Sequence, residues 1–407
     1  MQKIHKELEK LASISACPTP SVTRIVFSEQ DAKAREYFIG LCTDIGLKVR
    51  TDAVGNTFCR WEGKNKDLPA IGTGSHIDAI PESGMYDGTV GVFGGLEAIR
   101  YLMEMGYEPE RSIEVLMFTS EEPTRFGIGC LGSRMLCGQL SPEEALKFKD
   151  FDGRGLAELL ERFDFDGTLD EVKMGNDYYD AFVEFHIEQG PILEKEGLDI
   201  GIVTKIAAPS SLRVSLIGQG GHAGAVLMDK RRDAGCAAAE ISLAVERIAK
   251  ESTSPDTVAT TGILDIKPRA VNSIPKEAYL EIDLRDTDLE VRDKALEDLK
   301  QEIEEICKRR NIESTVELIN KDSPAICETK LIDAVEAATK ELGLTSKKMI
   351  SRAYHDSLFM AQVCPTTMIF IPCRDGISHH ADEYSTPEQI EKGVKTLALT
   401  LKTLSSK

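Results

Sequence analysis

Four apolar segments of the sequence each end in side chains that divalent metals favour as ligands. These segments occupy residues 68–78, 113–122, 180–189 and 366–380. The groups at or after their ends are His76, Asp78, Asp87, Glu121, Glu122, His186, His379 and His380. Because open α/β sheets bind ligands beyond the carboxyl ends of their strands, we expect these groups to converge although they span about 300 residues. Imidazoles and carboxylates in this combination suit two ions of the zinc or manganese kind.

A two-ion centre would give each type of residue a chemical task. The carboxylate of Asp87 could bridge both ions. Two ions lower the pKa of a shared water towards neutrality and polarise a carbonyl group. A glutamate that binds no metal would take the proton of that water and pass it to a leaving nitrogen. Glu121 and Glu122 can divide these tasks, and since neighbours on a strand face opposite ways, we expect the pair in the loop after the strand.

Each of these residues also has an ordinary structural explanation. A single histidine is more often a hydrogen-bonded structural residue, and adjacent glutamates usually lie on a solvated surface. The dipeptide Asp87-Gly88 is typical of a turn. The joint pattern favours the metal site, because every group follows an apolar strand of the same domain.

The elements that must position these groups alternate between strands and helices. The helical period of residues 91–106 separates the first two apolar segments, which indicates an α/β sheet covered by helices on both faces. Residues 210–311 differ, with alternating strands at 210–221, 256–266 and 277–286 and helices at 233–252 and 295–311. Their order resembles a ferredoxin-like β-α-β-β-α-β unit. We therefore predict a metal-binding catalytic domain at 1–206 and 321–407, with an inserted α+β domain at 207–320.

Composition narrows the class of function. The chain has 407 residues and a formal net charge of −19, which disfavours binding to nucleic acid. A local basic patch could still steer an anionic substrate. The start of the chain lacks the apolar core of a secretory signal, and no apolar run approaches the ~20 residues of a membrane helix. Ten cysteines without a CxxC pair indicate reduced thiols in a cytoplasmic protein.

Six segments resemble one known family. They are GTGSHIDAIPESGMYDGTVGV, FTSEEPTRFGIGCLGSR, FHIEQGPILE, GQGGHAGAVLMDKRRDA, NSIPKEAYLEIDLRD and GISHHADEYS. In this order they are similar to the signatures of the dinuclear metal-dependent amidohydrolases that act on N-carbamoyl compounds. That family belongs to the aminoacylase and carboxypeptidase-like clan. The motif HIEQGPxLE separates it from the peptidases of the clan, which have an aspartate ligand at that place.

The resemblance implies a ligand set for two divalent ions per subunit, Mn²⁺ or Zn²⁺, with Co²⁺ or Ni²⁺ as alternatives. The implied ligands are His76 and His186 for one ion, Glu122 and His379 for the other, and Asp87 as the bridge. Asp78 would orient His76, and Glu121 would be the general base. We choose His379 over His380 because it directly follows Ser378, and we note that HADEY replaces the family's usual x-P-x-E.

The resemblance also implies substrate contacts and a homodimer formed through the inserted domain, which would act as a lid. From that domain His222 would reach the partner's active site and stabilise the oxyanion. The implied substrate-binding residues are Gln189, at the carbamoyl end, Asn272 and Arg285, at the carboxylate, and Tyr354 and His355. Arg285 could instead form an ordinary ion pair with Asp283 or Asp286, and Tyr354 could simply pack the junction between strand and helix.

The substrate is the least constrained expectation. Residues 352–357, RAYHDS, are most similar to the branch of the family that acts on ureidoglycolate. That branch yields glyoxylate, ammonia and carbon dioxide at the last step of purine ureide breakdown. Alternatives are allantoate or an N-carbamoyl-L-amino acid as substrate, more distantly an aminoacylase or dipeptidase, and lastly a non-catalytic binding module.

Overall fold

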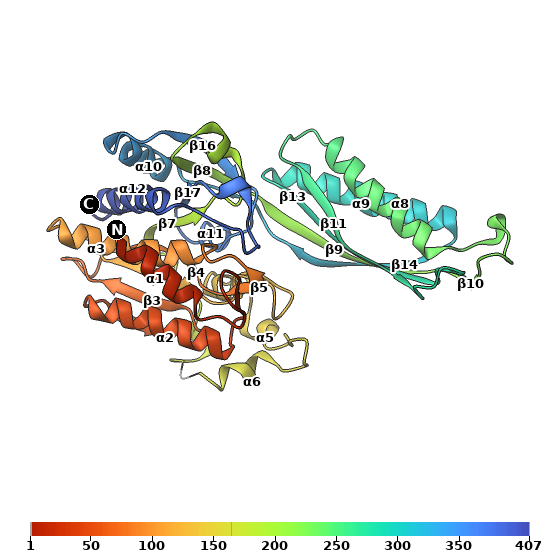
Figure 1. Ribbon diagram of the computed structural model, residues 1–407, viewed down its shortest axis with the longest axis horizontal. Coiled ribbons are helices and arrows are strands. Elements are labelled where there is room, and N and C mark those ends of the chain that lie inside the picture. Colours follow the sequence, from red (N-terminus) through yellow and green to blue (C-terminus); the bar gives the residue numbers. More distant parts are fainter. Residues whose placement is uncertain (1, 164, 407) are drawn as a thin grey trace. The chain divides into compact units, whose positions relative to one another are not determined.

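The structure, a computed structural model, describes residues 2–163 and 165–406. Contacts among the described residues divide the chain into two compact units (Figure 1). The first unit runs to Lys205 and also contains Ile326–Ser351 and the chain from His355 onward. The second unit consists of Ile206–Ala325 and Arg352–Tyr354. The second unit is therefore inserted in the sequence of the first.

The elements of the first unit alternate along the chain as the apolar pattern predicts. Its helices are α1 (Gln2–Ala12), α2 (Glu29–Asp44), α3 (Thr89–Glu104), α4 (Leu131–Leu136), α5 (Pro142–Ala145), α6 (Leu156–Leu160), α7 (Ile192–Glu196), α10 (Thr329–Glu341), α11 (Ser357–Met360) and α12 (Pro387–Ser405). Its strands are β1 (Val22–Arg24), β2 (Lys48–Thr51), β3 (Thr57–Trp61), β4 (Ala70–His76), β5 (Ala79–Ser83), β6 (Ile113–Phe118), β7 (Tyr179–Ile187), β8 (Ile200–Ile206), β16 (Ser346–Ser351) and β17 (Thr366–Ile371).

The main sheet is mixed and has the strand order β15-β8-β17-β7-β4-β6-β3-β2, where the short strand β15 is Ala325–Ile326 and β16 also pairs with β8. Strands β17, β7, β4 and β6 pair in parallel, whereas β3 and β8 pair antiparallel to their neighbours. Every residue of β4, β6 and β17 is buried, which is why these strands read as continuous apolar runs. The four apolar segments of the sequence are thus adjacent parallel strands, and their carboxyl ends meet at one edge.

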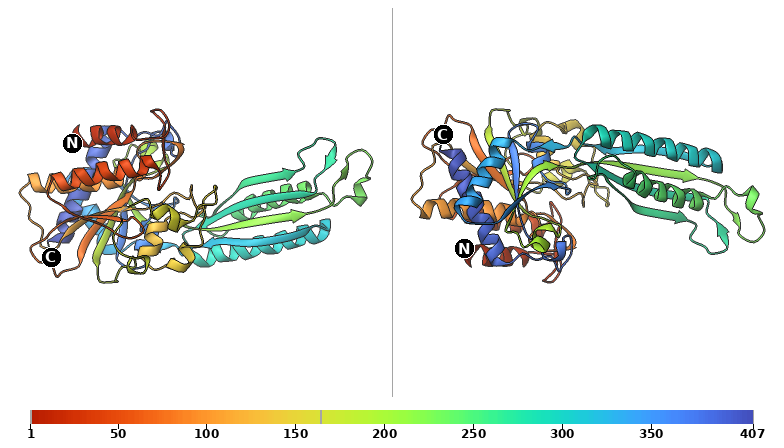
Figure 2. Two further views of the ribbon diagram at one scale, coloured as in Figure 1. Left: turned by 90° about the horizontal axis from the view of Figure 1, so that it is seen from below. Right: turned by 90° about the horizontal axis from the view of Figure 1, so that it is seen from above.

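Helices cover both faces of this sheet (Figure 2). The Phe185 ring of β7 lies against Gly94 of α3 and Gly393 of α12. The neighbouring Glu184 accepts a hydrogen bond from the main-chain N–H of Ser357 in α11. Because consecutive residues of a strand face opposite ways, α3 and α12 cover one face and α11 the other. The mixed α/β class predicted for this domain is confirmed.

The described part of the acidic segment 138–180 is largely a packed layer. Its buried residues Leu140, Ala145, Leu156, Leu159 and Val172 form one hydrophobic cluster with Val26, Phe27, Val54 and Leu131. Burial of that apolar surface stabilises the short helices α5 and α6 on the first unit.

The second unit is an antiparallel sheet with two long helices. Its elements are β9 (Ala208–Ile217), β10 (Gly221–His222), α8 (Ala234–Lys250), β11 (Val258–Lys267), β12 (Ser273–Ile274), β13 (Glu277–Asp286), α9 (Leu289–Arg310) and β14 (Glu313–Lys321). The sheet order is β11-β13-β9-β14, and β10 pairs with β12 separately. The predicted β-α-β-β-α-β order is observed. Helix α9 begins earlier than predicted because the Asp288 side chain accepts the N–H groups of Glu290 and Val291.

None of the helices in the described part of the chain combines the length and the apolar character needed to cross a membrane.

Candidate metal centre

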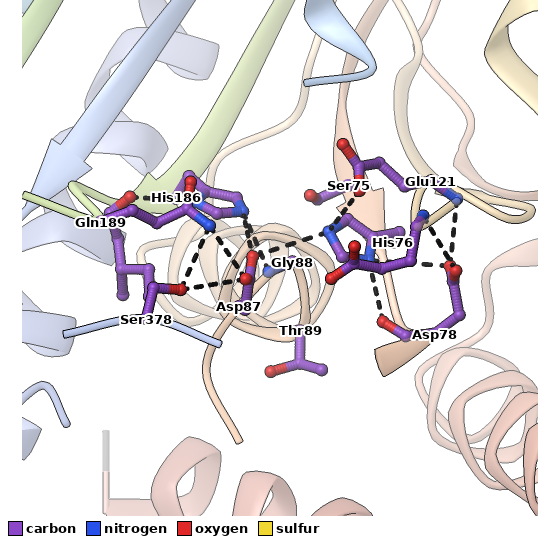
Figure 3. Close-up of polar contacts among 12 residues, drawn as sticks. Ser75, His76, Asp78, Asp87, Gly88, Thr89, Glu121, His186, Gln189 and Ser378 are labelled. Atoms are coloured by element: carbon purple, nitrogen blue, oxygen red, sulfur yellow. Dashed lines mark hydrogen bonds and ion pairs between the residues drawn. The ribbon is translucent and has the colours of Figure 1, made fainter. Parts of the chain in front are cut away.

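The carboxyl ends of the parallel strands place the predicted groups together (Figure 3). His76 is the last residue of β4 and His186 the penultimate residue of β7. Asp87 precedes α3, whose N-cap is Gly88. Glu121 and Glu122 follow the end of β6 at Phe118, in the loop as predicted. His379 lies in the segment between β17 and α12.

Two groups of donors share the carboxylate of Asp87. In the first, the ligand atoms of His76, Asp87 and His186 all lie within 4.8 Å of one another. In the second, the ligand atoms of Asp87, Glu122 and His379 meet the same limit. The structure therefore brings together all five residues for which the sequence predicted metal ligation, with Asp87 common to both groups.

The two oxygens of Asp87 point to different partners. Oδ1 lies 3.2 Å from Nε2 of His186 and 3.8 Å from Nε2 of His76. Oδ2 lies 3.1 Å from Nε2 of His379, which is itself 3.5 Å from Oε1 of Glu122. One carboxylate facing two separate donor sets is the arrangement that a bridging ligand requires.

The hydrogen bonds of the two buried histidines favour a cation between the donors. Nδ1 of His76 lies 3.0 Å from the main-chain oxygen of Asp78, and Nδ1 of His186 lies 2.9 Å from that of Ile187. Since a carbonyl oxygen only accepts, each neutral ring carries its proton on Nδ1 and leaves Nε2 as an acceptor, which in His186 receives the main-chain N–H of Gly88 at 3.0 Å. For His76 the Nε2 lone pair faces Oδ1 of Asp87 and, at 3.6 Å, Oε2 of Glu121. Acceptors that face acceptors in a buried site are stabilised by a cation, so the donor set fits a divalent metal.

The pKa shifts of the ionisable groups at the site also fit a bound divalent cation. Burial lowers the pKa of His76 to about 4, so this ring is neutral at physiological pH. Burial and the Glu122 carboxylate raise the pKa of Glu121 well above its usual range, and burial and Asp87 do the same for the pKa of Glu122. The hydrogen bond between His379 and Asp87 raises the pKa of the His379 imidazole to about 9. Burial is the larger cause of the raised glutamate pKa values, and crowded negative charge, which a divalent cation would compensate, adds to it.

Asp78 supports the site differently from the sequence-based expectation. Its carboxylate accepts the main-chain N–H of Glu121 at 3.2 Å and that of Glu122 at 3.1 Å. The closer contact to Nδ1 of His76 comes from the main-chain oxygen of Asp78, because Oδ1 is 3.6 Å away. Asp78 thus holds the loop of the glutamate pair with its side chain and the ring of His76 with its backbone.

Two further predicted residues of the first unit lie at the centre. Nε2 of Gln189 donates to Oδ2 of Asp87 at 2.9 Å and to Oγ of Ser378 at 3.2 Å. His355 is buried, and its ring centroid lies 4.6 Å from that of His186. His379 and His380 are both exposed, but Nδ1 of His380 accepts the N–H of Asp382, whereas Nε2 of His379 faces Asp87 and Glu122. The geometry therefore favours His379 over His380 as the candidate ligand.

The remaining predicted residues belong to the second unit. His222 and Asn272 line one open pocket of about 920 Å³ with Lys267, Arg269 and Lys276. Arg285 pairs with Asp283 through a 2.7 Å contact, the ordinary ion pair that the sequence left open. The Tyr354 hydroxyl donates to Asp322 at 3.0 Å.

The sequence-based reasoning missed three polar residues that support the site. Glu184 accepts hydrogen bonds from Ser75 and Ser357 beneath the centre. Ser378 donates to Glu383 beside Asp87. A single acid inside an apolar strand gives no signal of its role, so Glu184 could not be found from the pattern. The segment GISHHADEYS, however, already contained Ser378 and Glu383 close to the chosen histidine.

Comparison with known proteins defines the class. Residues 72–403 match the model of the Peptidase family M20/M25/M40. The chain belongs to this family of metal-dependent enzymes, and it is a hydrolase that acts on carbon–nitrogen bonds, as expected.

Individual members of the family show which known enzymes this chain is similar to. The chain is 52% identical over 409 residues to a ureidoglycolate hydrolase of Oryza sativa subsp. japonica, covering 99% of this chain and 84% of the relative. It is 36% identical over 401 residues to an N-carbamoyl-L-amino acid amidohydrolase of Geobacillus stearothermophilus, covering 98% and 97%. The crystal structure of AtUAH in complex with glyoxylate has a TM-score of 0.91 at 50% identity, covering 99% of this chain and 97% of that one.

Proposed function

We propose that this protein is a ureidoglycolate amidohydrolase with two divalent ions per subunit, Mn²⁺ or Zn²⁺. The observation that carries this proposal is the double donor group around Asp87 in a chain that is 52% identical to a ureidoglycolate hydrolase over nearly its whole length. The products would be glyoxylate, ammonia and carbon dioxide. The glyoxylate bound to AtUAH supports this product class.

His76, His186 and Asp87 would hold one ion, and Asp87, Glu122 and His379 the other. When bound, the two ions would supply an acidified water and a polarised substrate carbonyl. The protein's own groups carry the remaining steps. Glu121, whose pKa is raised by burial and by Glu122, would accept the proton of the water and deliver it to the departing amine.

The family resemblance supplies the proposed substrate contacts. Gln189, which lies beside Asp87, would contact the carbamoyl end, and His355, whose ring lies against that of His186, would be a further substrate-binding residue. Asn272 and Arg285 would bind the carboxylate, for which Arg285 would exchange its partner Asp283 for the substrate. Tyr354 would add a hydroxyl donor near the substrate.

We further propose that the inserted unit forms a homodimer and serves as a lid, with His222 stabilising the oxyanion in the partner's active site. The exposed position of His222 in a pocket with three basic side chains supports this role. The ten cysteines of the sequence are free thiols in the structure as described, which supports a cytoplasmic location.

A substrate panel with metal reconstitution tests the proposal. Protein stripped of metal would be reloaded with Mn²⁺, Zn²⁺, Co²⁺ or Ni²⁺ and assayed for ammonia release from ureidoglycolate, allantoate, N-carbamoyl-L-amino acids and a dipeptide. We expect the highest kcat/KM with ureidoglycolate. Turnover of N-carbamoyl-L-amino acids alone would show that the protein is an N-carbamoyl-L-amino acid hydrolase instead. The absence of activity with every metal would favour a non-catalytic binding module.

A further inference from the structure

Glu383 is a buried acid that no step of the proposed reaction uses. It lies between β17 and α12, and its residue exposure is 3%. Its Oε1 accepts the main-chain N–H of Tyr86 at 2.8 Å and that of Asp87 at 3.0 Å. Its Oε2 accepts the Ser378 hydroxyl at 2.8 Å. One side chain thus joins the backbone at Asp87 to the residue that precedes His379.

The Ser378 hydroxyl has one proton for two carboxylates. Its Oγ lies 2.8 Å from Oε2 of Glu383 and 3.1 Å from Oδ2 of Asp87. A hydroxyl donates one hydrogen bond at a time, and the shorter contact assigns the proton to Glu383. Oγ can then accept from Nε2 of Gln189 at 3.2 Å. Oδ2 of Asp87 keeps an available lone pair in the direction of His379.

The chain makes room for this side chain at Gly84. A Cβ atom at residue 84 would lie 2.3 Å from Cβ of Glu383 and 2.4 Å from its Oε1. Such distances exclude any larger residue without displacement of the carboxylate. The loop before Asp87 and the loop after His379 are therefore shaped around Glu383.

We propose that Glu383 is a positioning residue of the metal centre. It would set the main chain of the bridging carboxylate Asp87 and, through Ser378, the loop of His379, so that donors from distant parts of the sequence meet at one ion. Glu383 would not itself bind metal. The inference rests on the proposed ligand roles of Asp87 and His379.

The principal test compares metal binding by the wild type, Glu383→Gln and Glu383→Ala. Each dissociation constant would be measured by competition with a chelator for Mn²⁺ and Zn²⁺, with metal content from elemental analysis. Removal of an outer partner of a metal ligand costs about 10–100-fold in affinity, and we expect Glu383→Ala to weaken the ion held by Glu122 and His379 by that factor. Glu383→Gln keeps an oxygen for the two N–H groups, so it should lose several-fold less.

Kinetics supply a second readout. At limiting metal, Glu383→Ala should lose kcat while KM changes by less than about threefold, and excess metal should restore part of kcat. The matched control is Asp150→Ala. Asp150 is another buried carboxylate of the first unit that accepts two main-chain N–H groups, those of Asp152 and Arg154. Its loss should affect stability without changing the affinity for metal.

A double-mutant cycle with Ser378→Ala keeps the inference testable if the alanine variant of Glu383 does not fold. If Glu383 acts through Ser378, the effect of Glu383→Gln on metal affinity should shrink in the Ser378→Ala background. Strict additivity would overturn the proposed route. Metal affinity in folded Glu383→Ala equal to that of the wild type would overturn the inference, while two ions in the wild type would still uphold the proposed function. A wild type that binds no divalent ion would refute the proposed function itself.

Discussion

Glu121 and Glu122 are adjacent in sequence but have different neighbours. Oε2 of Glu121 lies 3.6 Å from Nε2 of His76, and Oε1 of Glu122 lies 3.5 Å from Nε2 of His379. We expect Glu121→Gln to retain both metal ions and to lower kcat by about 10²–10⁴, because an amide cannot accept the proton of water. Elemental analysis and steady-state kinetics on one preparation would measure both. Glu122→Gln is the paired variant and should lose metal. Turnover of Glu121→Gln within tenfold of the wild type would remove Glu121 as the base.

Two features of the structure require glycine at position 88, the positive backbone φ and the close approach of the His76 ring. Its φ is +65°, and a Cβ atom there would lie 2.3 Å from Nε2 of His76. We expect Gly88→Ala to destabilise the fold by about 1–3 kcal/mol and to displace His76, with loss of affinity for the first ion. Denaturant unfolding without metal and a metal titration would measure the two effects.

The matched control for this prediction is Gly106→Ala. Gly106 has a φ of +70°, but nothing lies within 4 Å of its Cβ position. It should show a similar backbone penalty with unchanged metal affinity. If both variants bound metal like the wild type, the close approach of Gly88 to His76 would have no role in the centre.

At the scale of single residues, the sequence predicted which side chains converge on the site but not which contacts hold them there. The apolar strands marked His76, Asp87 and His186 and the pairs at 121–122 and 379–380, and the family resemblance selected Glu122 and His379 within those pairs. The carboxylate of Asp78 was expected on His76, yet it accepts the N–H groups of the glutamate loop. The hydrogen bonds that hold the candidate ligands in place depend on loop conformation, which residue types alone do not specify. The positive φ of 57° at His379 is a further example.

At the scale of secondary-structure elements, the central strands could be predicted from the sequence because they are buried on both faces. The strands β4, β6 and β17 have no exposed face, so their apolar runs are unbroken and easy to recognise. The early start of α9 was missed because its first turn is charged and is fixed by a cap rather than by apolar spacing. The pairing order of the main sheet joins segments that are far apart in sequence, and no local pattern encodes it.

The turn between β2 and β3 offers a test of pH dependence. Oδ1 of Asp52 accepts the N–H groups of Val54 and Asn56, and burial raises the pKa of Asp52 from 3.8 to about 6. A raised carboxyl pKa in the folded state means that the folded state binds the proton more tightly. The stabilisation by that proton is fully present below about pH 4 and is lost as the pH rises through about 6.

We therefore expect the stability of the wild type relative to Asp52→Asn to fall by about 1–3 kcal/mol between pH 4 and pH 7. The asparagine does not titrate, so any fixed cost of the substitution, such as a clash with the Asn56 amide, cancels in the slope. Urea unfolding of metal-free protein across this range would measure it. A difference that is constant with pH would contradict the assignment.

At the scale of the whole molecule, net charge is a poor guide to the local field. The chain carries a formal charge of −19, yet the pocket around His222 is lined by Lys267, Arg269 and Lys276, with Glu277 as its acidic residue. A basic pocket in an acidic protein suits a small anionic substrate.

A subunit-mixing experiment decides whether His222 works in the partner's active site. Glu121→Gln and His222→Ala should each be inactive as homodimers. In a mixed dimer, one site would combine both substitutions and the other would be intact. Random exchange of equal amounts makes about half of the dimers mixed, so about a quarter of wild-type activity should return.

Mixing would be carried out under conditions that allow subunit exchange, with ammonia release from ureidoglycolate followed over time. The control mixes Glu121→Gln with Glu122→Gln, both in the first unit, for which no intact site can form if those residues act in one subunit. Activity that returned in the control as well would show a different division of the site. No recovery in the test pair, despite mixed dimers detected by differential tagging, would place His222 in its own subunit's site, whereas a fully active His222→Ala homodimer would place it outside the reaction.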